Sequence, residues 1–334
     1  MERTSEPSVK LGSFCISDNQ ETEKPERMGE EEWNVIRDMP RDLRQTSINL
    51  WKHMRVDRGL PDLLAEKQSQ TLTQGINIPL CPDLQRASPN IFLRSAIFSA
   101  IQGKNRRPMK NELIATQGGY EIRITVVETL DQFDFDVWLQ AIHLARCSPL
   151  GTVCTFTGNS FLKAIGRSNG KSDYTSLKKS LIRLRSAVLE IKCPDSSWVT
   201  FNLIQEAGGI NSRDVFMLSF NPFLIKLFAP DSWTALQWEQ RLQLKRKSLA
   251  LWLHGYFASH AAPFPIKIGT LMEMCGSETK EKKHFTAALK RALAELEKVA
   301  NIIAYLDGDL IITKKIPSPS QGRFLMKKEK KKSG

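Results

Sequence analysis

The stretch NSFLKAIGRSNGKSDYTSLKKSLIRLRSA, residues 159–187, decides the fold. Its spacing predicts a short helix over Asn159–Ile165, a polar turn, and a basic helix over Asp173–Ala187. Leucines recur at positions 177, 181 and 184 of the second helix, so they share one side and leave lysines on the other. A helix of this kind packs its apolar side on its own domain and presents a cationic side to a polyanion.

The flanking segments complete a small domain around this pair of helices. A strand is expected over Thr152–Phe156 and a hairpin over Leu189–Ile204. The order helix, turn, helix, hairpin is that of a winged helix, in which the hairpin is the wing.

The segment upstream predicts the rest of the first domain. A helix is expected over Asn90–Gln102, followed by a hairpin of Glu112–Gln117 and Tyr120–Glu128 that turns at Gly118-Gly119. A capping-box pattern, Thr129-Leu-Asp-Gln132, opens the next helix. The apolar face of that helix consists of Trp138, Ala141, Ile142 and Ala145.

The later half of the chain repeats this order. Its expected elements are a helix over Lys245–His260, a strand over Phe264–Ile268, a short helix over Thr270–Met274, a basic helix over Lys280–Val299, and a hairpin over Asn301–Lys315. The amino-acid sequences of the two basic helices are also similar, since SLKKSLIRL at 176–184 aligns with ALKRALAEL at 288–296. The sequence therefore predicts an α+β fold made of two tandem winged-helix domains.

These elements divide the chain into four parts. They are an acidic N-terminal tail or linker over 1–84, the first winged helix over 85–210, the second over 211–316, and a basic C-terminal tail over 317–334. The composition of the N-terminal tail is typical of disorder, and one amphipathic helix over Glu31–Val56 is the only regular element expected there. The closing run KKEKKK at 327–332 is expected to add nonspecific attraction to a polyanion.

The charge is unevenly distributed along the chain. Residues 1–84 hold 11 Lys and Arg against 15 Asp and Glu, whereas residues 85–334 hold 37 Lys and Arg against 21 Asp and Glu. Together they give the chain its net charge of +12. The part with the predicted domains is therefore strongly basic. Such a surplus favours nucleic acid or an anionic surface as the partner.

Other residue types exclude several classes of protein. The six cysteines form no Cys-x-x-Cys pair and the five histidines do not cluster near them, so we expect no metal site, no cofactor and no disulfide framework. No run of about 18 uncharged apolar residues occurs, and the N-terminus lacks the apolar core of a secretory signal. We expect a cytoplasmic protein without a membrane partner.

The cationic sides of the two basic helices supply the expected contacts with double-stranded DNA. In and before the first helix these are Arg167, Lys171, Ser172, Thr175, Lys178, Lys179 and Arg183. In the second helix and its hairpin they are Lys282, Lys283, Thr286, Lys290, Arg291, Lys314 and Lys315. Lys and Arg can bond guanine edges, and hydroxyl groups can bond phosphates or bases. The alternative for either helix is an ordinary solvated face.

The residues offer little for catalysis. GRSNGKS at 166–172 is similar to a phosphate-binding loop, but Ile165 stands where a Walker loop requires glycine. His254 and His260 lack the pairing that a metal-dependent nickase needs, and Tyr305 lacks the Arg and His of a tyrosine recombinase. We expect no enzymatic activity. Two alternatives remain open: a winged-helix transcriptional repressor, and an origin-nicking or strand-transfer enzyme.

Three stretches resemble the TrfA family of plasmid replication initiators. They are PNIFLRSAIF at 89–98, LDQFDFDVWLQAIHLAR at 130–146 and FLKAIGRSNGKS at 161–172. The resemblance implies a protein that binds direct repeats, called iterons, at a plasmid origin and helps to open the adjacent duplex. It also implies recruitment of the host initiator and the replicative helicase, a homodimer as the inactive form, and the second winged helix as the principal iteron reader.

The family also carries a sliding-clamp-binding pentapeptide, Gln-Leu-x-Leu-Phe, before its first domain. The corresponding stretch here is Asn77, Ile78, Pro79, Leu80 and Cys81, which differs at its first and last positions. The resemblance makes this segment a candidate clamp-binding site. The alternative is an extended linker with two buried aliphatic side chains.

Overall fold

The computed structural model describes residues 30–37, 78–102, 106–117, 120–147, 151–192, 197–210, 214–229, 231–300 and 302–330. The chain divides into two units, 1–56 and 57–334. In the first unit, helix α1 spans Glu30–Arg37. It begins one residue before the expected Glu31, and the rest of the helix predicted to Val56 lies outside the described residues.

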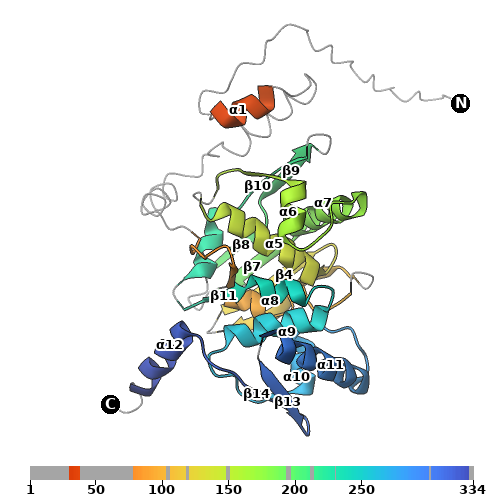
Figure 1. The fold of residues 1–334 in the computed structure, drawn as a ribbon, viewed down its shortest axis with the longest axis vertical. Helices are drawn as coiled ribbons and strands as arrows, with labels where there is room; N and C mark the ends of the chain where they lie inside the picture. Colours follow the sequence, from red (N-terminus) through yellow and green to blue (C-terminus); the bar gives the residue numbers. More distant parts are fainter. Residues whose placement is uncertain are drawn as a thin grey trace, which may run out of the picture. The chain divides into compact units, whose positions relative to one another are not determined.

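The second unit mixes helices and strands, as predicted (Figure 1). It opens with strand β1 (Gln85–Pro89), which pairs with β11 (Trp233–Gln237), and a single helical turn, α4 (Asn90–Leu93). The helix predicted to continue to Gln102 is wrong beyond Leu93. The chain turns there instead, so that β2 (Phe98–Ser99) pairs with β5 (Leu130–Asp131) and buries Phe98.

Helix α5 (Gln132–Ala145) is the central helix of the first half. Its N-cap is Asp131, whose carboxylate accepts hydrogen bonds from the backbone N–H groups of Phe133 and Asp134. The Asp134 carboxylate in turn accepts one from the backbone N–H of Asp131, which completes a capping box. The box predicted from Thr129 to Gln132 is therefore displaced by two residues. The carboxylate carries a negative charge, so it makes stronger hydrogen bonds with these N–H groups than a hydroxyl group would. The predicted apolar residues Trp138, Ala141, Ile142 and Ala145 are all buried.

A four-stranded antiparallel sheet lies in the same core as α5. Its strands are β3 (Met109–Gln117), β4 (Tyr120–Val126), β7 (Val188–Lys192) and β8 (Trp198–Asn202), in that order. The predicted upstream hairpin is thus confirmed, although its Gly118-Gly119 turn lies outside the described residues. The hairpin predicted after the first basic helix also forms, but β7 pairs with β4, so this hairpin extends the four-stranded sheet.

The first basic helix belongs to a set of elements that we call the first module. It contains α5, β6 (Cys154–Thr157), α6 (Gly158–Ala164), α7 (Lys171–Ser186), β9 (Glu206–Ile210) and β10 (Val215–Ser219). The strands form a sheet in the order β6-β10-β9. The hairpin beside α6 and α7 is therefore β9–β10, and the expected domain boundary between residues 210 and 211 falls inside it.

The later elements form a second module with the same strand order. It contains α9 (Ser248–Ser259), β12 (Ile266–Lys267), α10 (Ile268–Met274), α11 (Lys282–Ala300), β13 (Ile303–Asp307) and β14 (Leu310–Lys314). Here the sheet order is β12-β14-β13, so the strand before the short helix again pairs with the second strand of the hairpin. Helix α12 (Pro319–Lys330) follows, where only a tail was expected.

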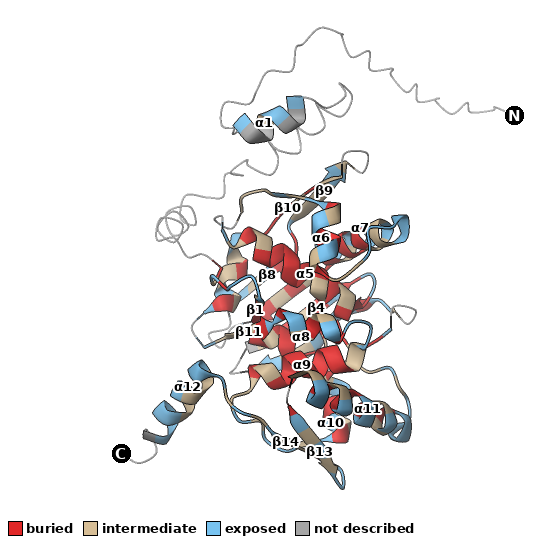
Figure 2. Cartoon of the chain, viewed as in Figure 1, coloured by how far each residue is buried: buried red, intermediate tan, exposed pale blue. Residues whose placement is uncertain are grey.

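Two separate clusters of buried side chains underlie the two modules, as the red residues of Figure 2 indicate. The first cluster runs from Ile78 to Trp238 and the second from Leu244 to Ile311. The 3-10 helix (Pro222–Phe228), β11 and the first residue of helix α8 (Trp238–Gln243) contribute to the first cluster. The division between the two cores therefore falls inside or just after α8.

Candidate nucleic-acid interface

Helix α11 has an apolar side and a cationic side, as the sequence predicts. Phe285, Leu289 and Leu296 are buried in the second core. Lys283, Lys290 and Arg291 are exposed. Among the described residues none of these three cations has an ion pair, so their charges face solvent and are free to meet a polyanion.

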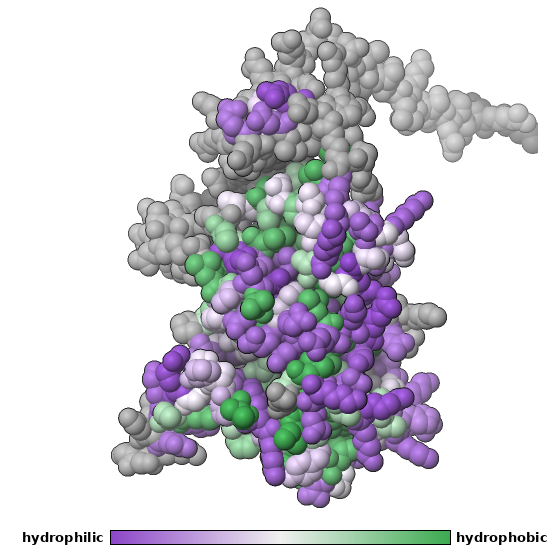
Figure 3. All heavy atoms as spheres, viewed as in Figure 1, coloured by the Kyte–Doolittle hydropathy of each residue, from purple (hydrophilic) through white to green (hydrophobic). Residues whose placement is uncertain are grey.

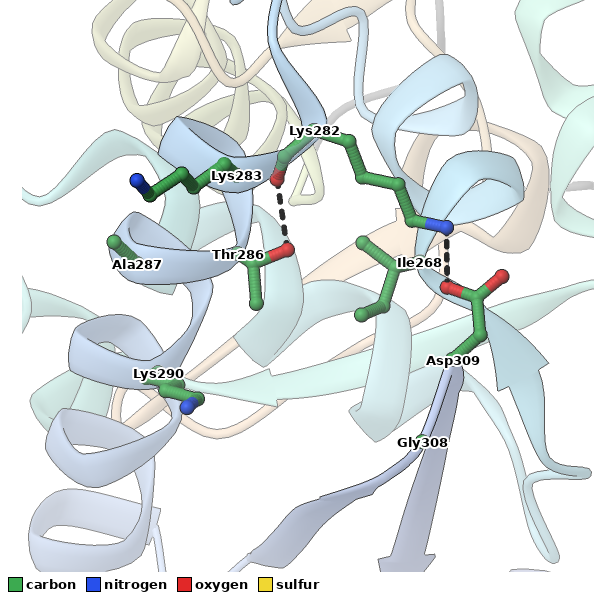
Figure 4. A pocket seen from close by; sticks show the side chains of 8 residues that line it. All are labelled: Ile268, Lys282, Lys283, Thr286, Ala287, Lys290, Gly308 and Asp309. Atoms are coloured by element: carbon green, nitrogen blue, oxygen red, sulfur yellow. Dashed lines mark hydrogen bonds and ion pairs between the residues drawn. The ribbon is translucent and has the colours of Figure 1, made fainter.

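A groove of about 600 Å³ runs between the first half of α11 and the tip of the β13–β14 hairpin (Figure 4). Its lining residues are Ile268, Lys282, Lys283, Thr286, Ala287, Lys290, Gly308 and Asp309. Lys282 Nζ lies 2.6 Å from Asp309 Oδ1, which ties the start of α11 to the hairpin tip. The Thr286 hydroxyl donates to the Lys282 carbonyl over 2.7 Å and keeps its oxygen available as an acceptor.

Helix α7 has the same division in the first module. Leu177, Leu181 and Leu184 are buried, and the predicted contacts on the opposite side are exposed. These exposed residues are Lys171, Ser172, Thr175, Lys178 and Lys179. α7 and α11 lie on the same side of the view in Figure 1, and Figure 3 shows hydrophilic side chains projecting along that side at both levels.

Arg183, predicted to contact DNA, instead binds a buried carboxylate. Its guanidinium lies 2.8 Å from Asp134 Oδ1, and the Asp134 side chain is fully buried. Ser180 Oγ and Arg106 bind the same carboxylate at 2.7 and 2.8 Å. Because a buried charge needs these partners, Arg183 holds α7 on α5, and its guanidinium is occupied within the protein.

Lys315 is the second predicted DNA contact whose charged group is occupied within the protein. Its Nζ donates to the carbonyls of Phe257, Ala258 and His260, at the end of α9. Burial and, to a lesser extent, the charge of Arg94 lower the pKa of Lys315 to about 8. Lys315 therefore caps a helix C-terminus. Lys314, one residue earlier, is exposed and lies 5.8 Å from the centre of the Tyr305 ring, where it can still reach a phosphate.

A second cationic groove lies on the turn before α7. Its volume is about 250 Å³, and its lining residues are Gly166, Arg167, Ser168, Asp173, Lys245 and Arg246. Arg167 was predicted from the sequence, and its guanidinium stacks 4.6 Å above the Phe133 ring. Lys245 and Arg246 were missed, because the sequence predicts a helix from Lys245 whereas α9 begins at Ser248. The run of three basic residues at 245–247 is the one feature of the sequence that indicates Lys245 and Arg246 as possible contacts.

The candidate clamp-binding segment is partly built into the protein. Ile78 and Cys81 are buried in the first core, whereas Leu80 is 74% exposed. Asn77 lies outside the described residues. A clamp-binding peptide must offer its apolar side chains to the partner. Ile78 and Cys81 cannot do so here, because they are packed in the core of this protein.

The sequence features that suggested chemistry have structural explanations. The turn at 166–172 follows helix α6 and not a strand, unlike a Walker loop. His254 is buried, and burial lowers its pKa to about 3. No group of three metal-ligating side chains occurs within the described ranges, and no helix described there is long and apolar enough to cross a membrane.

The chain resembles known initiators of replication. The TrfA protein family matches residues 66–315. A plasmid replication initiator protein TrfA from Escherichia coli is 28% identical over 243 residues, which cover 70% of this chain and 63% of that protein. The chain thus matches less than two thirds of that relative's length.

Two kinds of solved structure also align with the chain. Domains 2 and 3 of RctB align with a TM-score of 0.49 at 12% identity, covering 68% of this chain and 99% of that one. The Pi initiator protein, in complex with iteron DNA, aligns with a TM-score of 0.42 at 15% identity, covering 64% and 99%.

Proposed function

The chain belongs to the TrfA family, and from this premise we propose that it initiates plasmid replication by binding direct repeats, or iterons, in duplex DNA at a plasmid origin. Helping to open the origin and recruiting the host initiator and replicative helicase are part of this proposal. It further includes an inactive homodimer, a cytoplasmic location and the absence of any catalytic step.

The observation that carries this function is the cationic side of α11 with its adjoining groove. Lys283, Lys290 and Arg291 are exposed on one side of a 19-residue helix whose other side is buried. A helix that is held rigidly by its own core and exposes Lys and Arg fits the major groove, where these side chains bond guanine edges. The Lys282–Asp309 pair sets the hairpin beside the helix, in reach of the flanking phosphates.

We propose that each module is a winged helix. In each one a strand, a short helix, a turn and a basic helix precede a hairpin, and the strand orders β6-β10-β9 and β12-β14-β13 correspond. The wings are then β9–β10 and β13–β14. Helices α7 and α11 would enter neighbouring major grooves, so that one chain covers about two helical turns of a repeat.

The test is the selectivity of a Lys290→Ala/Arg291→Ala variant. Binding of the full chain to a duplex carrying its own repeat is compared with binding to a shuffled duplex of equal composition, at one fixed salt concentration. The wild type is expected to prefer the repeat by at least about 10³-fold. The variant should lose most of this preference while it keeps its folding transition.

A matched control is Glu297→Ala/Lys298→Ala, at two exposed positions near the end of the same helix that lie outside the groove. This control should keep the preference. Equal selectivity of the wild type and the Lys290→Ala/Arg291→Ala variant would show that α11 is not the reading helix.

A further inference from the structure

The loop between α8 and α9 places two cations opposite Arg167. Lys245 and Arg246 are exposed, and together with Arg167 they line the groove of about 250 Å³. Three positive side chains thus converge on one concavity. Within the described part of the chain none of the three has an ion pair, so their charges are available to an anion in the concavity.

This loop lies between the two basic helices. Leu242, just before it, is the nearest side chain to the position that a Cβ on Gly166 would occupy, at 3.2 Å, and Gly166 belongs to the turn that leads to α7. Lys247, at its other end, pairs with Glu295 of α11 over 2.7 Å. Lys245 and Arg246 thus lie in the loop that contacts both the turn before α7 and helix α11.

The loop is held rigidly by the protein. Leu244 is completely buried in the second core. Backbone N–H groups of Leu244, Lys245 and Lys247 each donate to a carbonyl three or four residues earlier, at 3.1–3.3 Å. The backbone that carries the two cations is consequently fixed, so binding a ligand there does not require the loop itself to become ordered.

Arg246 occupies a backbone conformation that favours glycine. Its φ is +66°, in the left-handed region, where a residue with a Cβ is strained. Glycine would relieve this strain but would remove the guanidinium. An arginine at such a position indicates a use for its side chain, and this observation is independent of the cluster of charges.

One acidic residue, Asp173, also lines the groove. Its Oδ2 accepts a hydrogen bond from Ser168 Oγ, so that oxygen is occupied. With three cations against one such carboxylate, the concavity keeps a net positive charge.

We propose that Arg167, Lys245 and Arg246 form a seat for phosphodiester groups of the DNA backbone, between the two segments of major groove that face α7 and α11. This seat rests on the proposed function. Phosphate contacts fix the register of a protein on the duplex and add affinity without sequence preference. The seat would therefore set the spacing of the two reading helices along one repeat.

The first experiment measures the salt dependence of binding for Lys245→Ala/Arg246→Gly in the full chain. Because each phosphate contact contributes about 0.9 to the slope of log affinity against log salt, the slope should fall by about two. The preference for the repeat over shuffled duplex should stay within about threefold of the wild type. Arg246→Gly removes the left-handed strain, so the melting temperature should not drop and a loss of fold cannot explain the result.

The second experiment locates the contacts on the DNA. Single phosphates of the repeat are replaced in turn by neutral methylphosphonates. For the wild type, a few positions between the two major-groove segments should weaken binding, and the double variant should be insensitive at those positions. A matched control, Lys110→Ala/Lys192→Ala on the four-stranded sheet, should keep the wild-type slope and profile, since both residues are exposed but lie outside the groove.

The outcomes separate the seat from the function. An unchanged slope together with an unchanged methylphosphonate profile would overturn the seat even if the repeat is still preferred. A wild type without preference for the repeat would overturn the proposed function. The slope on shuffled duplex still tests the seat in that case, because phosphate contacts also form on nonspecific DNA.

Discussion

At the scale of single residues, the buried charges of the first module distinguish packing from recognition. Asp134 is completely buried and receives Arg106, Arg183 and Ser180. In the sequence Arg183 is a basic residue of the same helix as Lys178 and Lys179, and nothing distinguishes its role from theirs. Only the position of Asp134, 49 residues away, shows that Arg183 points inward. No local pattern contains this information, so the sequence placed Arg183 among the DNA contacts.

Replacing Arg183 with alanine should therefore affect stability and not recognition. The free energy of unfolding should fall by about 2 kcal/mol, because a buried carboxylate loses one of its charged partners. Chemical denaturation measures this, and Arg185→Ala, at an exposed position of the same helix turn, should change it by less than about 0.5 kcal/mol. A loss of DNA affinity by folded Arg183→Ala without loss of stability would contradict the structural role.

A buried histidine, His254, and a half-buried one, His260, predict a dependence of stability on pH. Burial lowers the pKa of His254 to about 3, and that of His260 to about 4, from the ordinary value of 6.5. Below pH 6.5 the two histidines become protonated in the unfolded chain but stay neutral in the folded chain. Their full contribution to the free energy of unfolding is therefore present above pH 6.5 and is lost as the pH decreases toward 4. Each histidine contributes a slope of up to about 1.4 kcal/mol per pH unit.

The measurement is denaturation between about pH 7 and about pH 4.5 for the wild type and for His254→Gln. The free energy of unfolding of the variant should decline less steeply with falling pH, because glutamine does not bind a proton in the unfolded chain. His284→Gln, at an exposed position, is the control and should follow the wild type. Parallel curves for the wild type and His254→Gln would contradict the assignment.

At the scale of elements, local periodicity predicted the helices well and the sheets less well. The buried faces of α5, α7 and α11 were correct because the 3.6-residue period is a property of contiguous sequence. The hairpin predicted after the first basic helix joined the four-stranded sheet, and β9–β10 was not foreseen beside that helix, because both hairpins have strand-like sequences. The choice between them depends on whether β7 or β10 pairs with a distant strand, β4 or β6.

Two glycines at equivalent conformations offer a test of how the elements pack. Gly276, after α10, has φ +62°, and an added Cβ would lie 2.4 Å from Ser99 Oγ of the first half of the chain. Gly308, at the hairpin tip, has φ +57° with nothing within 4 Å. Gly308→Ala should cost about 1 kcal/mol for the backbone conformation alone. Gly276→Ala should cost more, about 2–4 kcal/mol, because the β2 region must also shift.

Thermal denaturation of the two variants checks this difference. Ser99→Gly in the Gly276→Ala background removes the clash and should recover part of the loss. Equal destabilisation of the two variants would show that Gly276 is required only for its backbone conformation.

At the scale of the whole second unit, Arg241 joins the two modules. It is 1% exposed, and its guanidinium binds Asp136 and Gln132 of α5 and the Leu251 carbonyl of α9. It also stacks 4.8 Å from the Phe135 ring. These contacts fix the module that holds α7 against the module that holds α11. Their relative placement was not predictable, since it depends on contacts between residues far apart in the sequence, such as those of Arg241 and the hydrogen bond from Trp252 to the Ser95 carbonyl.

Arg241→Leu should lower the free energy of unfolding by about 3–5 kcal/mol, because Asp136 would lose its buried partner. Calorimetry should then resolve two transitions, since the two cores no longer unfold together. The matched control is Gln243→Leu, at an exposed position of α8, which should keep one transition at the wild-type temperature. A single transition near that temperature for Arg241→Leu would mean that other contacts join the modules.

The central claim is that α7 and α11 lie in neighbouring major grooves of one repeat. Cleavage of the repeat by an iron chelate attached at Ile182→Cys in α7 or Ala287→Cys in α11 tests it most directly, with the labelled parent chain as the background. The two variants should each cut a single cluster, and the clusters should lie about 10 base pairs apart. Coincident clusters, or cuts spread evenly over repeat and shuffled duplex alike, would contradict the claim.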